Sequence, residues 1–155
     1  VPGAYGLSGM VPFGVAPLPK NATWEKECGA CHMAFHPSLL PAKSWAAIMS
    51  GLAQHFGEDA SLDAAAEKEI ADYLASHSAE SWDSLAANRF RNIDAAHPLE
   101  ITATRFWLRM HNDISPAVFS SKAVGAKQNC GACHRDAASG MFVPQDISIP
   151  REKTK

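Results

Sequence analysis

Apolar residues recur every three or four positions in two stretches of the chain, a spacing typical of amphipathic helices. One stretch predicts a helix that starts after Ser44 and stops at Gly57, with its apolar face built from Trp45, Ile48, Met49, Leu52 and Phe56. The other predicts a helix over 63–77, with Ala66, Ile70, Tyr73 and Leu74 on the buried side and Glu67, Glu69 and Asp72 on the solvent side.

Two further segments have weaker helical patterns. A short helix is expected over 20–33, with Asn21 or Thr23 as candidate N-cap residues. Another is expected over 104–114 and stops at Ser115-Pro116; its apolar side would hold Trp107, Met110, His111 and Ile114. No stretch alternates between apolar and polar residues as a strand would. The predicted fold class is mainly α.

The remaining segments suggest how the chain is divided. Residues 1–19 contain four Pro, four Gly and no charge, so we expect an extended arm that packs on the body through Tyr5, Phe13 and Leu18. The polar stretch at 76–84 marks a boundary between a first domain, 20–80, and a second, 81–155. Two domains of this size have little surface to bury by themselves, and a large apolar cofactor in each would complete the core.

Charge is distributed unevenly along the chain. The net charge is −2, but residues 1–80 hold 4 basic and 9 acidic residues, whereas residues 81–155 hold 10 and 7. Two halves of opposite charge are able to orient a docking partner. No basic run is interleaved with aromatic residues, which argues against nucleic acid as a partner. No apolar run is long enough to span a membrane, so membrane contact is expected to be peripheral at most.

One pentapeptide occurs twice, as Cys28-Gly-Ala-Cys31-His32 and Cys130-Gly-Ala-Cys133-His134. C-x-x-C-H is the attachment signature of c-type haem, in which each cysteine forms a thioether with a vinyl group and the histidine lies under the iron. The sequence therefore predicts two covalently bound haem c groups, with His32 and His134 as the proximal ligands. We expect each of these histidines to donate its other ring N–H to a backbone carbonyl or to water.

Other uses of the four cysteines fit less well. A zinc site has no need of a histidine directly after both cysteine pairs. A thioredoxin-like pair would need a βαβ context, which the pattern lacks. Two-residue spacing is tight for a stabilising disulfide.

The sixth ligand of each iron has to come from elsewhere in the chain. His55 falls on the apolar side of the helix expected over 44–56, and His111 takes the equivalent place in the segment before the second motif. They are the favoured distal ligands. His97, in extended backbone before Pro98, is the alternative for the second haem.

Other candidates for the sixth position are weaker. Met49 and Met110 would give His/Met iron of higher potential, but core packing is the ordinary role of such residues. His36 lies one turn after His32 and so points from the proximal side. For His77, which closes the third helix, capping of the helix end is a sufficient role.

The residues also suggest partners for the haem propionates and a location for the protein. Arg105 and Arg109 are candidate partners for haem propionates, because Arg binds carboxylates in a bidentate way. Bacterial haem attachment takes place outside the cytoplasmic membrane, so a periplasmic protein is expected. The first residue, Val1 rather than Met, agrees with removal of a signal peptide.

Beyond the two pentapeptides, the chain resembles the bacterial dihaem cytochrome c family from about residue 20 onward. The residues that carry this resemblance are His36-Pro-Ser-Leu-Leu-Pro41-Ala-Lys-Ser-Trp45, Leu52-Ala-Gln-His55-Phe-Gly57, Ile101-Thr-Ala-Thr104, His111-Asn-Asp-Ile114, Asn129-Cys-Gly-Ala-Cys-His134-Arg-Asp136 and Ile147-Ser-Ile-Pro150. The resemblance implies a class I cytochrome c-like N-terminal domain closed by the 63–77 helix, and a small, irregular C-terminal haem domain. His36 stands where relatives are expected to have Pro.

The resemblance also implies a function. Both haems would have two histidine ligands and low potential, with His32 opposite His55 and His134 opposite His111. The protein would pass electrons to an oxygen-binding monohaem c-type cytochrome, the sphaeroides haem protein, and a membrane-bound b-type cytochrome is the expected donor. A carrier of single electrons, not an enzyme, is therefore predicted. The alternative is a peroxidase-like dihaem enzyme or gas sensor with one open or labile iron.

Overall fold

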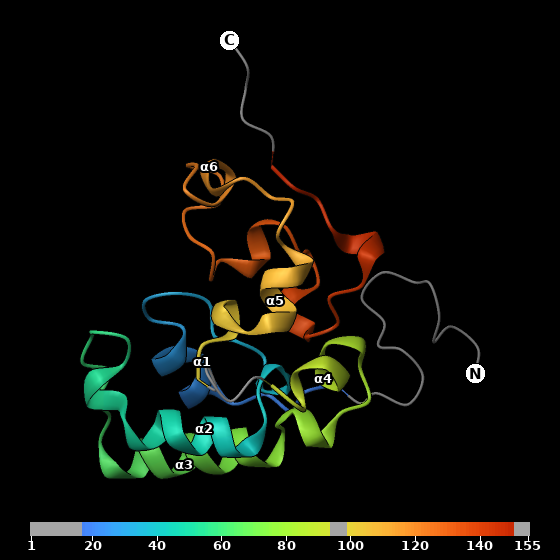
Figure 1. Ribbon diagram of the computed structural model, residues 1–155. Helices are drawn as coiled ribbons and strands as arrows, with labels where there is room; N and C mark the ends of the chain where they lie inside the picture. Colours follow the sequence, from blue (N-terminus) through green and yellow to red (C-terminus); the bar gives the residue numbers. More distant parts are fainter. Residues whose placement is uncertain (1–16, 94–98, 151–155) are drawn as a thin grey trace.

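The computed structural model describes residues 17–93 and 99–150 and is mostly helical (Figure 1). Within these ranges there are six α-helices and several short 3-10 turns, and no strand is present. The predicted mainly α fold is confirmed. The helices are α1 (Ala22–Cys28), α2 (Ala42–Ser50), α3 (Ala64–Ser76), α4 (Leu85–Phe90), α5 (Arg105–Met110) and α6 (Pro116–Phe119).

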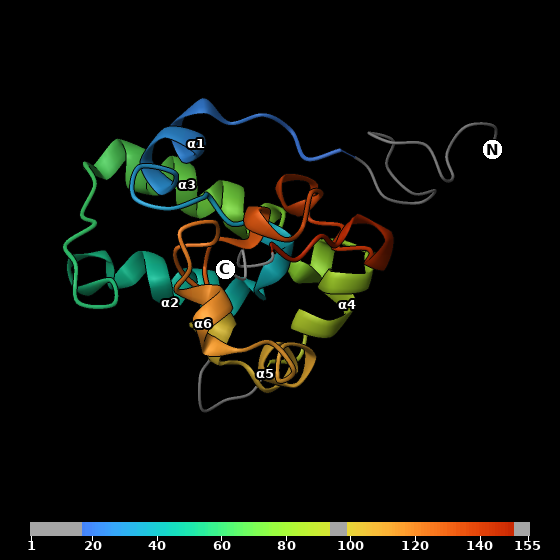
Figure 2. The ribbon, with the colours of Figure 1, turned by 90° about the horizontal axis from the view of Figure 1, so that it is seen from above.

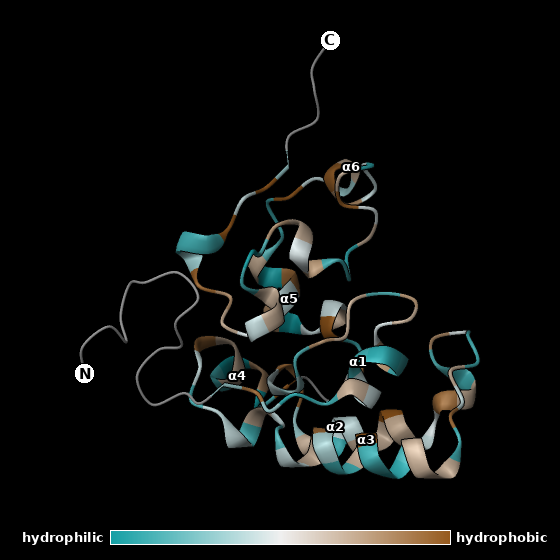
Figure 3. Cartoon of the chain, turned by 180° about the vertical axis from the view of Figure 1, so that it is seen from behind, coloured by the Kyte–Doolittle hydropathy of each residue, from teal (hydrophilic) through white to brown (hydrophobic). Residues whose placement is uncertain are grey.

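Helices α2 and α3 lie side by side along one edge of the molecule (Figures 1 and 2). Both carry a mixture of hydrophilic and hydrophobic residues, as an amphipathic helix requires (Figure 3). The helix predicted over 63–77 is confirmed as α3. Its N-cap is Asp63, whose carboxylate accepts a hydrogen bond from the backbone N–H of Ala66 at 2.8 Å, and its C-cap is His77.

The helix predicted over 44–56 is shorter than expected and starts earlier. It is α2, which ends at Ser50 because Gly51 follows and donates its N–H to the carbonyl of Ile48 at 3.0 Å, closing the last turn. A 3-10 turn follows, and His55 comes directly after it in non-helical backbone. The prediction that His55 lies on the apolar face of a helix is therefore wrong, because glycine ends the helix before the periodic pattern does.

The two weaker helical patterns also gave helices that are shorter than predicted. Asn21 is the N-cap of α1, accepting from the N–H of Trp24 at 2.9 Å, and the helix ends where Gly29 follows Cys28. Helix α5 ends at Met110, so His111 is its C-cap residue and not part of its face. Helices α4 and α6 were not predicted, because six and four residues are too few to show a helical period.

The largest hydrophobic core contains residues from both sides of the predicted boundary at 76–84. Trp24, Tyr73 and Leu74 pack in the same cluster as Ile101 and Trp107. A smaller cluster, made of Ala79, Trp82, Ala87 and Met141, joins the boundary region to the C-terminal part. Helices α5 and α6 and the chain that follows them lie above α1 and α2 in Figure 1. Shared packing thus connects the two halves, and the division into two domains stays a prediction.

The end of the predicted N-terminal arm packs on the body. Leu18 contacts both hydrophobic clusters, and the carbonyl of Pro19 accepts a 2.6 Å hydrogen bond from the hydroxyl of Tyr73. Tyr5 and Phe13, also predicted to pack there, lie outside the described residues. In the part of the chain that the structure describes, no helix has the length and apolar character needed to cross a bilayer.

Candidate functional site

Two histidine side chains face each other beside the first C-x-x-C-H motif. The rings of His32 and His55 have their centroids 6.4 Å apart and are inclined by 27°. Nδ1 of His32 donates to the carbonyl of Met33 at 2.8 Å, and Phe35 stacks on the same ring at 4.9 Å. The expectation that a proximal histidine donates its second N–H to a carbonyl is confirmed here, and this bond leaves Nε2 of His32 available as a ligand.

A second pair of imidazoles faces one another beside the other motif. The ring centroids of His134 and His111 are 6.2 Å apart, at an angle of 69°. Nδ1 of His111 donates to the carbonyl of Trp107 at 2.7 Å, and the indole stacks on the imidazole with centroids 4.1 Å apart. His134 packs against Phe142 at 4.9 Å. Its buried Nδ1 has no hydrogen-bond partner among the described residues, so the expected hydrogen bond is not found for this histidine.

Both separations fit a metal ion held between the two rings. A bond from a metal to an imidazole nitrogen is about 2 Å long, so two nitrogens bound from opposite sides are about 4 Å apart. Each ring centroid lies about 1 Å behind its nitrogen, which places the centroids about 6 Å apart when the bonds are collinear. The observed 6.4 and 6.2 Å match this arrangement in both places. The four histidines therefore fit two irons with imidazole on both sides.

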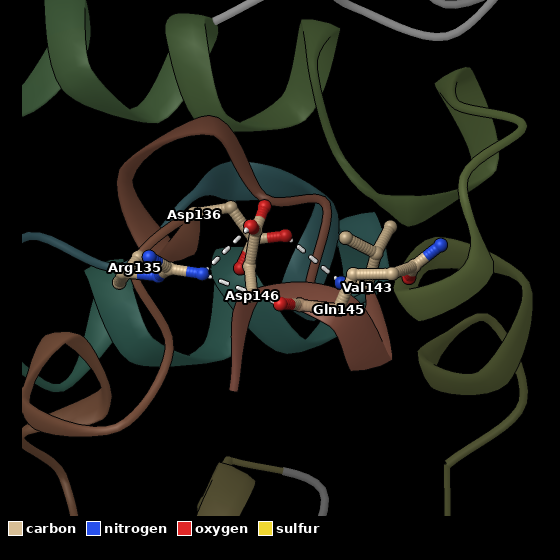
Figure 4. A network of polar contacts seen from close by, with 5 residues as sticks. All are labelled: Arg135, Asp136, Val143, Gln145 and Asp146. Carbon is tan, nitrogen blue, oxygen red and sulfur yellow. Dashed lines mark hydrogen bonds and ion pairs between the residues drawn. The ribbon is translucent and has the colours of Figure 1, made fainter. Parts of the chain in front are cut away.

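The second motif is held in place by the segment that follows it (Figure 4). The carbonyl of Cys133 accepts from the N–H of Ser148 at 2.7 Å, and the N–H of Arg135 donates to the carbonyl of Asp146 at 3.1 Å. In addition, the carboxylate of Asp136 accepts from the N–H of Val143 at 2.8 Å. These bonds hold the backbone on both sides of His134, whose ring centroid lies 6.2 Å from that of His111.

The four cysteines of the two motifs are not linked to one another. All four cysteines are free of disulfides. Burial raises the pKa of Cys28 and of Cys130 to about 11, so both are protonated thiols at neutral pH. In residues 17–93 and 99–150 no cluster of three or more His, Cys, Asp or Glu side chains is arranged to bind a metal ion.

The other residues considered for the sixth position have different roles. Nδ1 of His77 donates to the carbonyl of Tyr73 at 2.8 Å, which confirms its capping role at the end of α3. Met49 is buried in the main core, as expected of a packing residue. Met110 is 60% exposed, so the prediction of a core position is wrong for it. His97, the alternative to His111, lies outside the described residues.

Both arginines proposed as propionate partners lie at the surface. Arg105 and Arg109 are exposed on α5, and neither forms an ion pair with another described residue. Their pairing with haem propionates stays a prediction.

The role of Trp107 was not predicted from the sequence, where it appeared only as a residue on the same apolar helix side as His111. The structure shows that this residue contacts His111 twice, through its ring and through its carbonyl. The spacing of four positions between them was a usable signal, because a side chain at a helix C-terminus often reaches the carbonyl one turn back.

His36 is fully buried at the contact between the first and second halves of the chain. Its ring is 1% exposed, and its Nδ1 accepts a hydrogen bond from the N–H of Ser38 at 3.2 Å, which leaves the proton on Nε2. Trp82 lies against the ring in an edge-to-face arrangement, with centroids 4.8 Å apart. Burial, assisted by the nearby His77, lowers the pKa of His36 to about 4. This histidine is a neutral core residue that does not face another imidazole.

The buried, neutral His36 predicts a pH dependence of stability. Between pH 6.5 and about 4 the unfolded chain binds a proton at this position and the folded protein does not, so the free energy of unfolding falls as the pH falls. At pH 5 the loss relative to neutral pH is about 2 kcal/mol. Urea titrations at pH 7 and pH 5 should show this loss in the wild type and a smaller one in a His36→Leu variant. Equal losses in the two proteins would contradict the assignment.

The fold and the site together define a c-type cytochrome with two haem-binding motifs, each faced by a second imidazole. Comparison with known families agrees, because the model of the dihaem cytochrome c family matches residues 24–142. The chain belongs to the dihaem cytochrome c family. Its four cysteines, in two C-x-x-C-H motifs, serve the two covalently attached haem c groups that define this family.

Solved structures show the same relationship. A dihaem cytochrome c from Rhodobacter sphaeroides is 39% identical over 82% of this chain and 100% of its own, with a TM-score of 0.67. A dihaem cytochrome c from Shewanella baltica OS155 is 35% identical over 85% of this chain and 94% of its own, with a TM-score of 0.66. No curated protein matches the chain.

Proposed function

We propose that the protein carries single electrons between redox proteins through two six-coordinate haems. Cys28 and Cys31 would attach one haem and Cys130 and Cys133 the other. The axial ligands would be His32 with His55 for the first haem, and His134 with His111 for the second. The observation that carries this proposal is the separation of the paired rings, 6.4 and 6.2 Å, which suits one iron between each pair.

This arrangement suits electron transfer and not catalysis. Haem supplies an iron that changes oxidation state by one electron, and two imidazoles on each iron leave no position for a substrate. The protein's own contribution is to hold the ligands still. His32 is fixed by Phe35 and a backbone carbonyl, and His111 by Trp107, so little has to move when the charge changes. The protein is accordingly an electron carrier and not an enzyme.

Charge supports a transient, electrostatically oriented docking with other redox proteins. The stretch from Glu58 to Asp72 is acidic and its charged side chains are largely exposed, whereas residues 81–155 are basic overall. The proposed acceptor is an oxygen-binding monohaem c-type cytochrome, similar to the sphaeroides haem protein, and the proposed donor a membrane b-type cytochrome. Both fit a periplasmic protein with at most peripheral membrane contact.

Low-temperature EPR of the fully oxidised protein tests the ligand assignment. Two overlapping low-spin signals with the g-values of bis-imidazole haem are expected, integrating to two spins per chain. A high-spin signal from half of the iron would show that one haem lacks a sixth ligand and would overturn the proposed ligation.

Stopped-flow mixing tests the carrier role separately. The reduced protein is expected to reduce an oxygen-binding monohaem cytochrome c in two steps, one electron each, with rates that fall as salt is added because docking is electrostatic. If no electron exchange occurs within seconds although EPR shows the two expected low-spin signals, the ligand assignment stands and the carrier role is refuted.

A further inference from the structure

The two distal histidines are held by very different contacts. His55 follows a 3-10 turn in the loop that joins α2 to α3, at the outer edge of the molecule (Figures 1 and 2). His111 caps a helix whose neighbouring turn packs in the main core. If both bind iron, the free energy needed to detach each imidazole depends on what else holds it.

The loop around His55 is fastened mainly to itself. The backbone of His55 exchanges two hydrogen bonds with Glu58, at 2.7 and 3.0 Å, and the N–H of Ala60 donates to the carbonyl of Leu52 at 2.8 Å. None of these bonds connects the loop to another part of the protein. No hydrogen bond to the ring of His55 is present among the described residues, so the ring is placed by the loop backbone and by neighbouring aromatic rings.

The same loop carries backbone strain and little buried surface. Phe56, next to His55, has a φ of +51° although it is not glycine, and its side chain is 58% exposed. Gly57 follows with a φ of +90°. Leu52 and Leu62, at the two ends of the loop, pack on the main core, but no side chain from Gln54 to Asp59 is buried. Opening of this central part therefore releases an unfavourable conformation and uncovers little apolar surface, two features of segments that open locally at low free-energy cost.

His111 is anchored in three ways. Its backbone N–H donates to the carbonyl of Trp107 at 3.1 Å, and Nδ1 of its ring donates to the same carbonyl at 2.7 Å. The indole of Trp107 stacks on the imidazole, and Trp107 is itself a buried member of the main core, with the ammonium of Lys127 5.8 Å from its ring centroid. Withdrawal of His111 would have to break the stacking contact and both hydrogen bonds.

We propose that His55 is an exchangeable ligand and that its haem binds small neutral diatomic molecules, whereas His111 stays in place. This inference rests on the proposed bis-histidine ligation. In the exchange, the bond from Nε2 of His55 to iron would break and one bond from the diatomic molecule to iron would form, with no change in the oxidation state of the iron. The chain would thus carry electrons through both haems and respond to a diatomic ligand at the haem of the first motif.

Carbon monoxide added to the fully reduced protein is the direct probe. One equivalent per chain is expected to bind, slowly, with a rate that levels off at high carbon monoxide because release of His55 becomes limiting. If the open form is populated at about 0.1–10%, His55→Ala should bind the same equivalent about 10- to 1,000-fold more tightly. In that variant the rate should rise linearly with carbon monoxide.

Matched variants assign the slow phase to one haem. His111→Ala should bind one additional equivalent of carbon monoxide rapidly and still bind the slow equivalent. His55→Ala should bind one equivalent rapidly in place of the slow one. Trp107→Leu should give a second slow equivalent, and Trp107→Phe, which retains a flat ring, should not. No uptake by the wild type, or a slow phase that survives in His55→Ala, would overturn the inference. A fast, linear uptake by the wild type would instead refute the six-coordinate ligation itself.

Discussion

Alanine in place of His111 is expected to convert the haem at the second motif from low spin to high spin and to leave the other haem unchanged. The ring centroids of His111 and His134 are 6.2 Å apart, which suits one iron bound by both imidazoles, and a methyl side chain at position 111 would leave that iron without a sixth ligand. In EPR of the oxidised variant, one of two low-spin signals should disappear and a high-spin signal of one spin should replace it.

A matched control for this substitution is His77→Ala. His77 also caps a helix and also donates Nδ1 to the carbonyl four positions earlier, at 2.8 Å, as His111 does at 2.7 Å. It lies against Tyr73 and not against another imidazole. Both low-spin signals should therefore remain in His77→Ala. Retention of both signals in His111→Ala would instead mean that another residue, such as His97, binds the second iron.

Substitution of Gly140 by alanine is expected to be strongly destabilising. Gly140 has a φ of +74°, which costs a residue with a side chain about 1–2 kcal/mol. A Cβ atom there would also lie 2.6 Å from Cγ and Nδ1 of the buried His36 ring, so the packing between the two halves would have to shift, at about 1–3 kcal/mol more. Urea unfolding followed by circular dichroism should show a total loss of about 2–5 kcal/mol.

Gly125→Ala is a control that separates the two causes of the stability loss in Gly140→Ala, the positive φ and the contact with His36. Gly125 has a similar φ of +87°, but a Cβ there would have no atom within 4 Å. This variant should lose only the backbone contribution, and a second substitution, His36→Ala, should restore part of the stability of Gly140→Ala by making room. Equal losses in Gly125→Ala and Gly140→Ala would show that the contact with His36 does not limit the packing.

The helix pattern of the sequence was informative where a helix packs along its whole length. Residues 63–77 gave α3 almost to the residue, because Asp63 caps its start and Ile70, Tyr73 and Leu74 are buried. In contrast, the pattern over 44–56 continued past the end of α2. Gly51 stops that helix, and the later apolar residues Leu52 and Phe56 lie in a loop whose shape no local period indicates.

The candidate ligands show the same limit. His55 and His111 were selected because they were expected on apolar helix faces, yet neither lies in a helix. What the structure supplies is the facing of each imidazole against a proximal one, His55 against His32 and His111 against His134. The two residues chosen from the sequence do face the motif histidines. They do so from a loop and a helix end, and not from the helix faces on which they were expected.

The sequence alone determined that this chain holds two covalent haems, because attachment chemistry depends on two cysteines and a histidine that are neighbours in the chain. Only the tertiary structure decided which imidazole faces each motif, since the members of each pair are 23 positions apart and meet through loop and helix-end packing. It alone also decided how firmly His55 and His111, the two proposed distal ligands, are held. The attachment motif can be recognised in the sequence because its residues are neighbours in the chain. The pairing of the imidazoles and the contacts that hold them depend on residues that are far apart in the chain.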